Sequence, residues 1–365
     1  MKIERVIISG GGTGGHIFPA IAIADEIKKR NPKAAILFVG ANGKMEMEKV
    51  PAAGYEIKGL TISGFQRKFT FSNFLLPFKI LNSLLNARKI LKDFKPQVVI
   101  GVGGYASGPT LKAAAMLKIP TVVQEQNSFP GKTNKLLAKN ATAICTAYEG
   151  LEKFFPKEKI TLTGNPVRFE MVNIAGKRKE AFEYYKLDES KKTILIIGGS
   201  LGARTLNESI INKYDLVSES DVQVIWQCGK LYFSQLTELL KDKVAPSIKM
   251  VQFIDRMDLA YAMADVIISR AGAISVSELC LINKPVILVP SPNVSEDHQT
   301  KNAMALVSKK AAILMKDSDA KEQLLPVAID LLNNEIVKNS LAQEISKLGK
   351  SKATESIVDV IENSL

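Results

Sequence analysis

The chain has 365 residues and is long enough for two domains with separate cores. Its composition, 46% hydrophobic and 24% charged residues, is typical of globular proteins. Its three cysteines, Cys145, Cys228 and Cys280, lie far apart, which excludes a disulfide framework and a zinc motif and favours a reducing compartment. The 49 Lys and Arg residues outnumber the 37 Asp and Glu residues, so the formal net charge is +12.

This positive charge is compatible with a polyanionic partner (nucleic acid, anionic lipid or a phosphorylated substrate) and equally with a generally basic proteome. Its distribution is uneven, because no acidic residue occurs between Glu56 and Asp93. No apolar run reaches about 18 residues, so we expect no membrane-spanning helix. No signal peptide precedes the first predicted strand, and we expect a cytoplasmic protein.

Short β-rich segments alternate with helical ones in two series, separated by a charged stretch at residues 177–192. We expect strands at residues 5–9, 35–39, 55–61, 97–102, 121–124, 143–146 and 160–163, and then at 193–197, 223–227, 249–253, 266–269, 286–289 and 312–315. Strands separated by helices predict parallel sheets, so the fold class is α/β, with two doubly wound Rossmann-like domains facing a cleft. We place the domains at residues 1–167 and 168–344, with a C-terminal helix at about 345–365 packing back on the first. Ligands of such folds bind at the carboxyl ends of the strands.

The first predicted strand ends in the turn GGGTGG at residues 10–15, and a helix follows with Pro19 in its first turn. This arrangement aims backbone N–H groups and a helix N-terminus at a phosphate. No Gly-Lys-Ser/Thr follows, so the turn is not a P-loop, and its spacing fits the dinucleotide fingerprint imperfectly. His16 ends the turn, where a histidine is exposed and suited to act as a general base.

The second series opens with a similar turn, GGSLGART at residues 198–205. We expect Ser200 to cap the following helix and Arg204 to lie in its first turn, with a diphosphate on the helix N-terminus; a tight turn without a ligand is the alternative. A third strand-to-helix turn spans residues 269–278. Its Glu278 is positioned to accept the hydroxyls of a ribose, or only to favour the helix dipole.

Other predicted strands also end in polar or glycine-rich segments, namely GVGGYASGP at residues 101–109 and QEQN at 124–127. Arg168, at the predicted domain junction, could reach a phosphate or form an interdomain salt bridge. The spacing of His, Cys and carboxylate residues predicts no metal site.

Residues 74–92 predict a basic amphipathic helix. Its apolar stripe consists of Phe74, Phe78, Leu81 and Leu85, and its cations include Lys79, Arg88 and Lys89. Such a helix can lie on an anionic membrane surface, or it can be a core helix with a solvated cationic edge. The absence of acidic residues around it favours the membrane.

Seven motifs occur in the order in which they occur in the MurG family, and the resemblance covers nearly the whole chain. They are GGGTGGHIFPA, GVGGYASGP, QEQNSFPGKTNK, TGNPVR, GGSLGAR, SRAGAISVSE and EDHQTKNA. This family consists of bacterial UDP-N-acetylglucosamine (UDP-GlcNAc) transferases that act on undecaprenyl-diphospho-muramoyl-pentapeptide in peptidoglycan synthesis.

The resemblance implies a GT-B fold and an inverting hexosyltransferase that needs no metal or cofactor. It implies two substrates, UDP-GlcNAc and the lipid-linked muramoyl-pentapeptide, and peripheral attachment to the cytoplasmic face of the inner membrane. A nucleic acid is not an implied partner. Two alternatives with the same architecture are a UDP-GlcNAc 2-epimerase, which needs no lipid acceptor, and a nucleotide-sugar-binding protein without turnover. An NAD-dependent dehydrogenase fits less well, because neither glycine turn has the required spacing.

The matching positions imply residue roles. The donor would be contacted by Thr13, Gly14, Gly15, Asn127, Arg168, Ser200, the backbone of Ile254, Ala273, Ile274, Ser275, Val276, Ser277, Glu278 and Gln299. Within this set, Arg168 and Ser200 would hold the diphosphate and Glu278 the ribose. The family often has His where this chain has Gln124, which puts a catalytic role for that side chain in doubt.

Two further hypotheses concern the acceptor. We expect its attacking hydroxyl to lose a proton to His16, with Glu125 as the second candidate base. We expect its diphosphate on the glycine turns of the first domain, at Gly12, Gly103, Gly104, Tyr105 and Ser107.

Overall fold

A computed structural model describes residues 2–62, 76–243 and 245–365, and for residues 76–79 and 295 it describes the backbone alone. The chain divides into two compact units. Unit 1 comprises Met1–Val167 and Lys352–Leu365, and unit 2 comprises Arg168–Ser351.

The sheet of unit 1 has seven parallel strands in the order β3-β2-β1-β4-β5-β6-β7. Residues of β1 alternate between the two faces of this sheet, because successive side chains of a strand point to opposite sides. Val6 and Ile8 enter one core and Ile7 the other. The strands are β1 (Arg5–Gly10), β2 (Ala35–Ala41), β3 (Glu56–Leu60), β4 (Val98–Gly103), β5 (Thr121–Glu125), β6 (Ala143–Thr146) and β7 (Ile160–Leu162).

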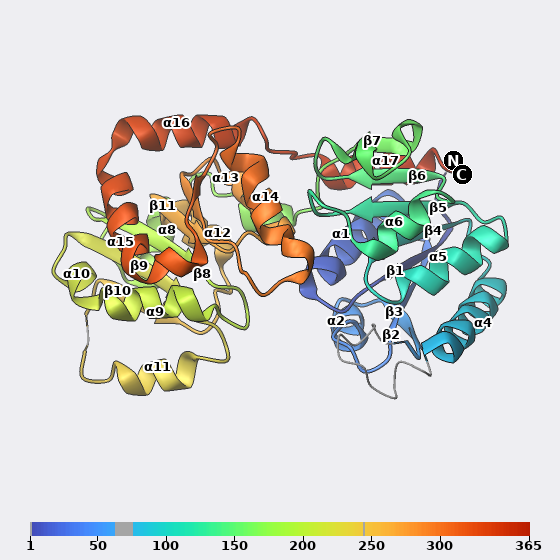
Figure 1. Ribbon diagram of the computed structural model, residues 1–365, viewed down its shortest axis with the longest axis horizontal. Coiled ribbons are helices and arrows are strands. Elements are labelled where there is room, and N and C mark those ends of the chain that lie inside the picture. Colours follow the sequence, from blue (N-terminus) through green and yellow to red (C-terminus); the bar gives the residue numbers. More distant parts are fainter. Residues whose placement is uncertain (1, 63–75, 244) are drawn as a thin grey trace. The chain divides into compact units, whose positions relative to one another are not determined.

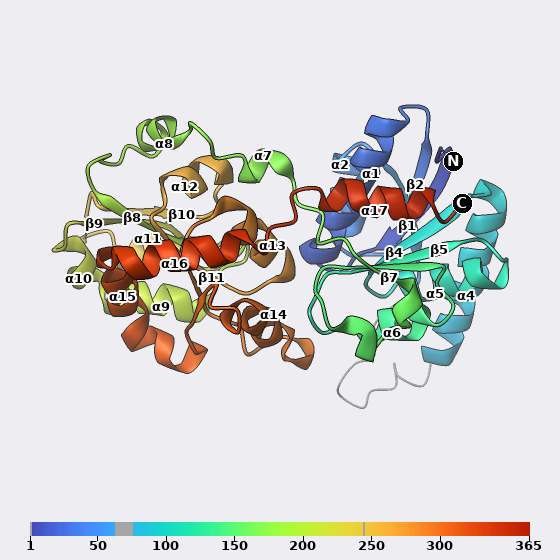
Figure 2. The same ribbon diagram turned by 90° about the horizontal axis from the view of Figure 1, so that it is seen from above.

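Helices cover both faces of this sheet, as Figures 1 and 2 show. One face carries α1 (Gly14–Arg30), α2 (Glu46–Ala52) and α17 (Ala353–Glu362). The other carries α4 (Leu76–Phe94), α5 (Ser107–Met116) and α6 (Lys132–Ala138). Short turns of 3-10 helix, η1 (Leu151–Lys153) and η2 (Lys157–Lys159), precede β7.

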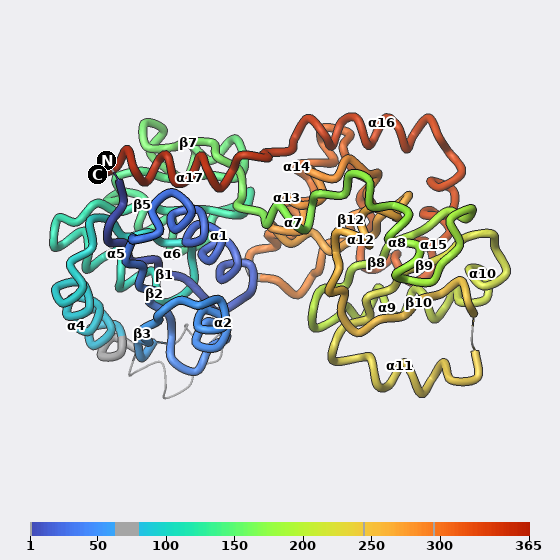
Figure 3. The backbone as a smooth tube through the Cα atoms, turned by 180° about the vertical axis from the view of Figure 1, so that it is seen from behind, coloured from blue at the N-terminus to red at the C-terminus, as the bar shows by residue number. Residues whose placement is uncertain are grey.

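The C-terminal helix α17 packs beside α1 in unit 1, at the opposite end of the sequence (Figure 3). Its Ile357, Val358 and Ile361 are buried in the core that α1 also lines. Arg30, at the end of α1, donates hydrogen bonds to Asp359 at 2.7 Å and Glu362 at 2.9 Å. The segment that returns to unit 1 therefore begins at Lys352, later than residue 345, because the preceding helix, α16, packs against α13 of unit 2.

Unit 2 has six parallel strands in the order β10-β9-β8-β11-β12-β13. Its strands are β8 (Lys192–Ile197), β9 (Val222–Gln227), β10 (Ile248–Val251), β11 (Val266–Ser269), β12 (Val286–Leu288) and β13 (Ile313–Leu314). Its helices are α7 (Phe169–Val172), α8 (Arg178–Tyr185), α9 (Arg204–Asn212), α10 (Tyr214–Ser218), α11 (Phe233–Leu239), α12 (Met257–Met263), α13 (Ala273–Ile282), α14 (His298–Val307), α15 (Asp317–Asn333) and α16 (Glu335–Ser346), with a 3-10 turn η3 (Ser295–Asp297).

Both sheets confirm the predicted doubly wound class, and all predicted strands are observed with ends shifted by at most two residues. The strand order reverses between β1 and β4 in unit 1 and between β8 and β11 in unit 2. Ligands of such sheets bind in the crevice that opens at the carboxyl ends of the strands at this reversal. The turns that follow β1 and β4 are therefore the candidate site of unit 1, and the turns that follow β8 and β11 are that of unit 2.

Candidate functional site

In unit 1 the turns after β1 and β4 pack directly against each other. The N–H of Gly11 donates to the carbonyl of Gly103 at 3.3 Å. Gly104 has φ 89°, and a Cβ at this position would lie 2.4 Å from the carbonyl oxygen of Gly11, so only glycine fits this contact. The Ser107 hydroxyl is buried and directs its one proton towards two carbonyls, those of Ser9 at 2.7 Å and Gly103 at 2.9 Å. Its geometry is that of a structural tie between the two turns, and its contact with a diphosphate stays a prediction.

A buried carboxylate that the sequence analysis did not single out braces the first turn. Glu46, in α2, is 1% exposed and accepts hydrogen bonds from the N–H groups of Gly12 at 2.8 Å and Ala41 at 3.0 Å. It also explains Gly11, because a Cβ there would lie 2.2 Å from this carboxyl group. The N–H of Gly12 is therefore occupied. At the start of α1 the N–H groups of His16 and Ile17 donate to the carbonyl of Thr13, so those of Gly14 and Gly15 are the first-turn donors without a partner inside the helix. The predicted contact of Gly12 with the acceptor diphosphate would have to replace the Glu46 bond.

His16 lies in the first turn of α1 and is partly buried. Its Nδ1 is 3.1 Å from Oε1 of Gln126, which follows the carboxyl end of β5. A Cβ on Gly103 would lie 2.8 Å from Cε1 of the imidazole ring, so Gly103 and His16 are in close contact. The predicted base therefore lies at the strand reversal, within hydrogen-bond distance of Gln126 and in packing contact with Gly103.

Glu125, the second candidate base, is 1% exposed. Oε1 accepts from the backbone N–H of Asn127 at 3.0 Å and from its side-chain amide at 3.2 Å. Oε2 accepts from the N–H of Gly131 at 3.2 Å and the amide of Asn134 at 2.8 Å. These hydrogen bonds occupy both carboxylate oxygens of Glu125. The geometry favours an anchoring role for Glu125 in the loop that carries Asn127.

In unit 2 the turn after β8 reaches α9 by a different route from the one predicted. The helix begins at Arg204, and its N-cap is Ala203, in an extended conformation. The expectation that Ser200 caps α9 was wrong, because Gly202, with φ 91°, adds a further turn before the helix starts. Ser200 is exposed in this turn, and its carbonyl accepts from the N–H of Lys230 at 3.0 Å. Its contact with a diphosphate stays a prediction.

Glu278 lies on α13, which follows β11, and is partly buried. Burial raises the pKa of its carboxyl group to about 6, against the opposing effects of a hydrogen bond from the Tyr261 hydroxyl at 3.2 Å and of the Arg168 charge. Arg168 directly precedes α7, which packs against α13. Two residues predicted to hold the donor, Arg168 and Glu278, therefore lie in one electrostatic environment within unit 2. A third, Ala273, begins the same helix α13.

Two other predicted donor contacts already have partners in unit 2. The N–H of Ile254 donates to Oε1 of Gln227 at 3.2 Å. The backbone group of Ile254 that remains to contact the nucleobase of the donor is therefore its carbonyl. Oε1 of Gln299, in α14, accepts from the N–H of Ser291 at 2.9 Å. Both contacts stay predictions.

The helix α4 exposes apolar side chains, as predicted. Leu81 and Leu85 are 55% and 57% exposed, next to exposed Arg88 and Lys89, whereas Ala87 and Leu91 are buried against the sheet. The predicted Phe74 lies outside the described residues, and the side chains of Phe78 and Lys79 are not described. Among the helices of the described chain, none is both long and apolar enough to cross a membrane.

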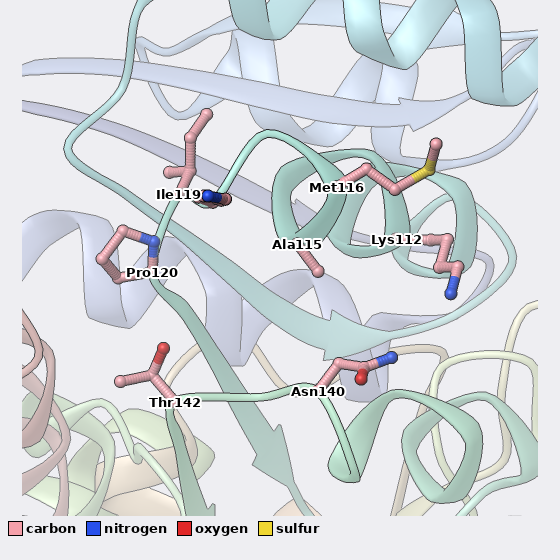
Figure 4. A pocket seen from close by; sticks show the side chains of 8 residues that line it. Lys112, Ala115, Met116, Ile119, Pro120, Asn140 and Thr142 are labelled. Carbon is pink, nitrogen blue, oxygen red and sulfur yellow. The ribbon is translucent and has the colours of Figure 1, made fainter.

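A cavity of 390 Å³ lies beside α5 at the amino end of β5, the opposite edge of the sheet from His16. Figure 4 shows Lys112 and Asn140 directed into it. Lys118 and the apolar Met116 and Ile119 also line it. Of the site residues predicted in the described chain, none lines this cavity, so it is separate from the candidate active site.

Two Rossmann-like units, each with glycine turns at the strand reversal of a parallel sheet, are the architecture of the GT-B fold class. Family models agree with this assignment. The glycosyltransferase family 28 N-terminal domain matches residues 6–146, and the glycosyltransferase family 28 C-terminal domain matches residues 193–361.

Individual relatives narrow the assignment. The chain is 56% identical over 361 residues to a Flavobacterium psychrophilum protein named UDP-N-acetylglucosamine–N-acetylmuramyl-(pentapeptide) pyrophosphoryl-undecaprenol N-acetylglucosamine transferase, covering 99% of this chain and 98% of the relative. It also resembles the crystal structure of Acinetobacter baumannii MurG, with a TM-score of 0.79, 28% identity and 99% of each chain covered. The chain belongs to the MurG family within glycosyltransferase family 28 and is a glycosyltransferase.

The rival 2-epimerase shares only the fold. The structure of UDP-GlcNAc 2-epimerase from Neisseria meningitidis bound to UDP-GlcNAc has a TM-score of 0.67 to this chain at 15% identity, covering 98% of this chain and 99% of that one. Such a likeness carries no argument about substrate or reaction.

Proposed function

We propose that the protein transfers N-acetylglucosamine from UDP-GlcNAc to the 4-hydroxyl of the muramoyl sugar of undecaprenyl-diphospho-muramoyl-pentapeptide, with inversion at the anomeric carbon. The support is the near full-length similarity to transferases whose printed names contain both substrates. The structural observation that carries the proposal is His16, a partly buried imidazole fixed at the strand reversal of unit 1.

Unit 1 is proposed to bind the acceptor. The start of α1 directs N–H groups and the positive end of the helix dipole out of the first glycine turn, which suits the acceptor's diphosphate. Tyr105, 49% exposed on the neighbouring turn, is positioned to line the same site. His16 accepts the proton of the attacking hydroxyl as the new glycosidic bond forms, and this removes positive charge from the attacking oxygen.

Unit 2 is proposed to bind the donor. Glu278 accepts hydrogen bonds from the ribose hydroxyls, and Arg168 and the exposed turn at Ser200 hold the diphosphate. The bond from the anomeric carbon to the diphosphate oxygen breaks as the new bond forms, and UDP leaves with an additional negative charge. Donors positioned in advance for this charge lower the barrier, because they need not reorganise during the reaction.

The helix α4 is proposed to bind the cytoplasmic surface of the inner membrane, where the lipid-linked acceptor resides. Exposed Leu81 and Leu85 would enter the headgroup region, while Arg88 and Lys89 contact anionic phosphates. The cavity at Lys112 and Lys118 adds cations to the same side of the sheet, because it lies beside α5, which packs against α4.

The direct test supplies the purified protein with radiolabelled UDP-GlcNAc and lipid-linked muramoyl-pentapeptide and follows labelled lipid and released UDP. We expect equal amounts of both products and no product without the acceptor. Conversion of UDP-GlcNAc to an epimer without the acceptor would contradict the proposal in favour of an epimerase. Binding of UDP-GlcNAc without turnover would contradict it in favour of a nucleotide-sugar-binding protein.

A further inference from the structure

We propose that Gln126, oriented by Gln124 and Asn165, holds His16 in the neutral tautomer that carries its proton on Nδ1. The lone pair then lies on Nε2, which becomes the atom that accepts a proton. This assignment rests on the proposed function for the role of His16 as a base, whereas the tautomer itself is a property of unit 1. Gln126 is thus a positioning residue.

The orientation of the Gln126 amide follows from its surroundings. Its Nε2 donates to the backbone carbonyl of Val102 at 2.7 Å and lies 3.3 Å from the carbonyl of Gln124. Backbone carbonyls only accept hydrogen bonds, so the NH₂ group of Gln126 must face them. Oε1 of Gln126 then faces Nδ1 of His16 at 3.1 Å, and since this oxygen only accepts, the ring nitrogen must donate.

The amides of Gln124 and Asn165 in turn fix the orientation of the Gln126 amide. Nε2 of Gln126 also donates to Oε1 of Gln124, and Nε2 of Gln124 donates to Oδ1 of Asn165 at 3.0 Å. The amide of Asn165 donates to the backbone carbonyl of Gln126 at 2.9 Å, which fixes its own orientation. Hydrogen-bond donation in the relay therefore runs in one direction, from His16 through Gln126 and Gln124 to Asn165.

Burial makes this direction costly to reverse. Gln124, Gln126 and Asn165 are 0%, 1% and 2% exposed, so a flipped amide would place oxygen against oxygen without water to compensate. Gly103 adds a packing contact, because a Cβ there would lie 2.8 Å from the His16 ring. These contacts thus fix both the orientation of the His16 ring and the nitrogen that carries its proton.

The chemical nature of Gln126 suits a base. A carboxylate at this position would also accept from Nδ1–H, but its negative charge would favour the protonated, inactive ring before the reaction. A neutral amide selects the tautomer without this charge. Gln124 is likewise a neutral amide and serves as a link in the relay.

The test observes the tautomer directly. The chain has two histidines, so a protein labelled with ¹⁵N in its imidazole rings gives two ring systems, and His16→Asn identifies the one that disappears. At a pH where the ring is neutral, we expect His16 of the wild-type protein to show a protonated Nδ1 and an unprotonated Nε2. The opposite pattern in the wild-type protein would overturn the proposal without any variant.

Two variants at Gln126 distinguish an effect on the His16 tautomer from an effect on folding. Gln126→Leu removes the acceptor, and we expect the Nε2-protonated tautomer to appear and kcat to fall about 10- to 100-fold, with little change in the KM for UDP-GlcNAc. Gln126→Glu keeps an acceptor beside Nδ1, and we expect Nδ1 to stay protonated while the doubly protonated ring becomes more populated. Retention of a purely Nδ1-protonated ring in Gln126→Leu would contradict the relay.

Gln223→Leu is the matched control, because Gln223 is a glutamine 1% exposed in unit 2 that bonds to the backbone of Asp188 at 2.7 Å and 3.1 Å. It should lower stability but change neither the His16 signals nor kcat. If Gln126→Leu changes the tautomer and leaves kcat unchanged, the positioning role is contradicted. If His16→Ala retains turnover, the base role fails while the wild-type tautomer still tests the relay.

Discussion

The two glycine turns that open the units have the same strand–turn–helix design but are stabilised differently. In unit 1, side chains brace the turn, with Glu46 holding Gly12 and Ser107 tying Ser9 to Gly103. In unit 2, a backbone hydrogen bond stabilises the turn: Ser200 is exposed, and its carbonyl accepts from the N–H of Lys230. The braced turn suits the precise placement of a catalytic side chain, whereas the exposed turn leaves N–H groups accessible to an anionic ligand.

The largest expected effect tests whether the braced turn is the catalytic one. His16→Ala should lower kcat about 10²- to 10⁴-fold, because it removes the proposed proton acceptor, and should leave the KM for UDP-GlcNAc nearly unchanged. Steady-state assays with both substrates measure this. A variant with near wild-type turnover would show that the base lies elsewhere.

The second prediction addresses the bracing itself. Glu46→Ala removes a buried acceptor from two N–H groups, of which that of Ala41 is buried, and should lower the free energy of unfolding by about 2–4 kcal/mol. Thermal or denaturant unfolding measures the change. Ser200→Ala is the matched change in the other turn, and it should leave Tm unchanged while raising the KM for UDP-GlcNAc. Equal loss of stability in the two variants would remove the distinction between the turns.

The third prediction concerns which unit binds the membrane. Replacement of Lys79, Arg88 and Lys89 by Glu should weaken binding to vesicles containing anionic lipid at least tenfold, since each basic residue near such a surface contributes about 1 kcal/mol. Co-sedimentation with phosphatidylglycerol-containing vesicles measures this. The control reverses three exposed lysines of unit 2, Lys316, Lys321 and Lys350, and changes the net charge equally. If the control loses as much binding, the effect belongs to net charge and not to α4.

The smallest predicted effect tests the donor site. Burial raises the pKa of Glu278 to about 6, so below this pH the carboxyl group is increasingly protonated and a poorer acceptor for ribose hydroxyls. The KM for UDP-GlcNAc should therefore rise as pH falls through about 6, by about tenfold at one pH unit below the pKa. Glu278→Gln should have a raised KM that no longer depends on pH in this window. A persistent pH dependence in that variant would assign the titration to another group.

The parallel strands and the glycine turns were predictable because their signals are local. Runs such as Val6–Ile7–Ile8 specify buried strands, and the glycines after them specify turns that another residue could not adopt. The ordered motifs also predicted the family, which the comparisons confirm. The wrong cap at Ser200 arose within such a local signal, because Gly202 delays the helix by an additional turn.

Only the tertiary structure decided which polar side chains are available for chemistry. Glu46 reaches Gly12 from 34 residues away, and Gln126 reaches His16 from 110 residues away. The sequence offers Glu125 as a candidate base, yet both of its oxygens accept hydrogen bonds from the loop and the helix α6 that follow it. Spacing along the chain encodes which element a residue occupies. It does not encode which distant donor or acceptor satisfies that residue, because those partners meet only when the sheet and its helices pack.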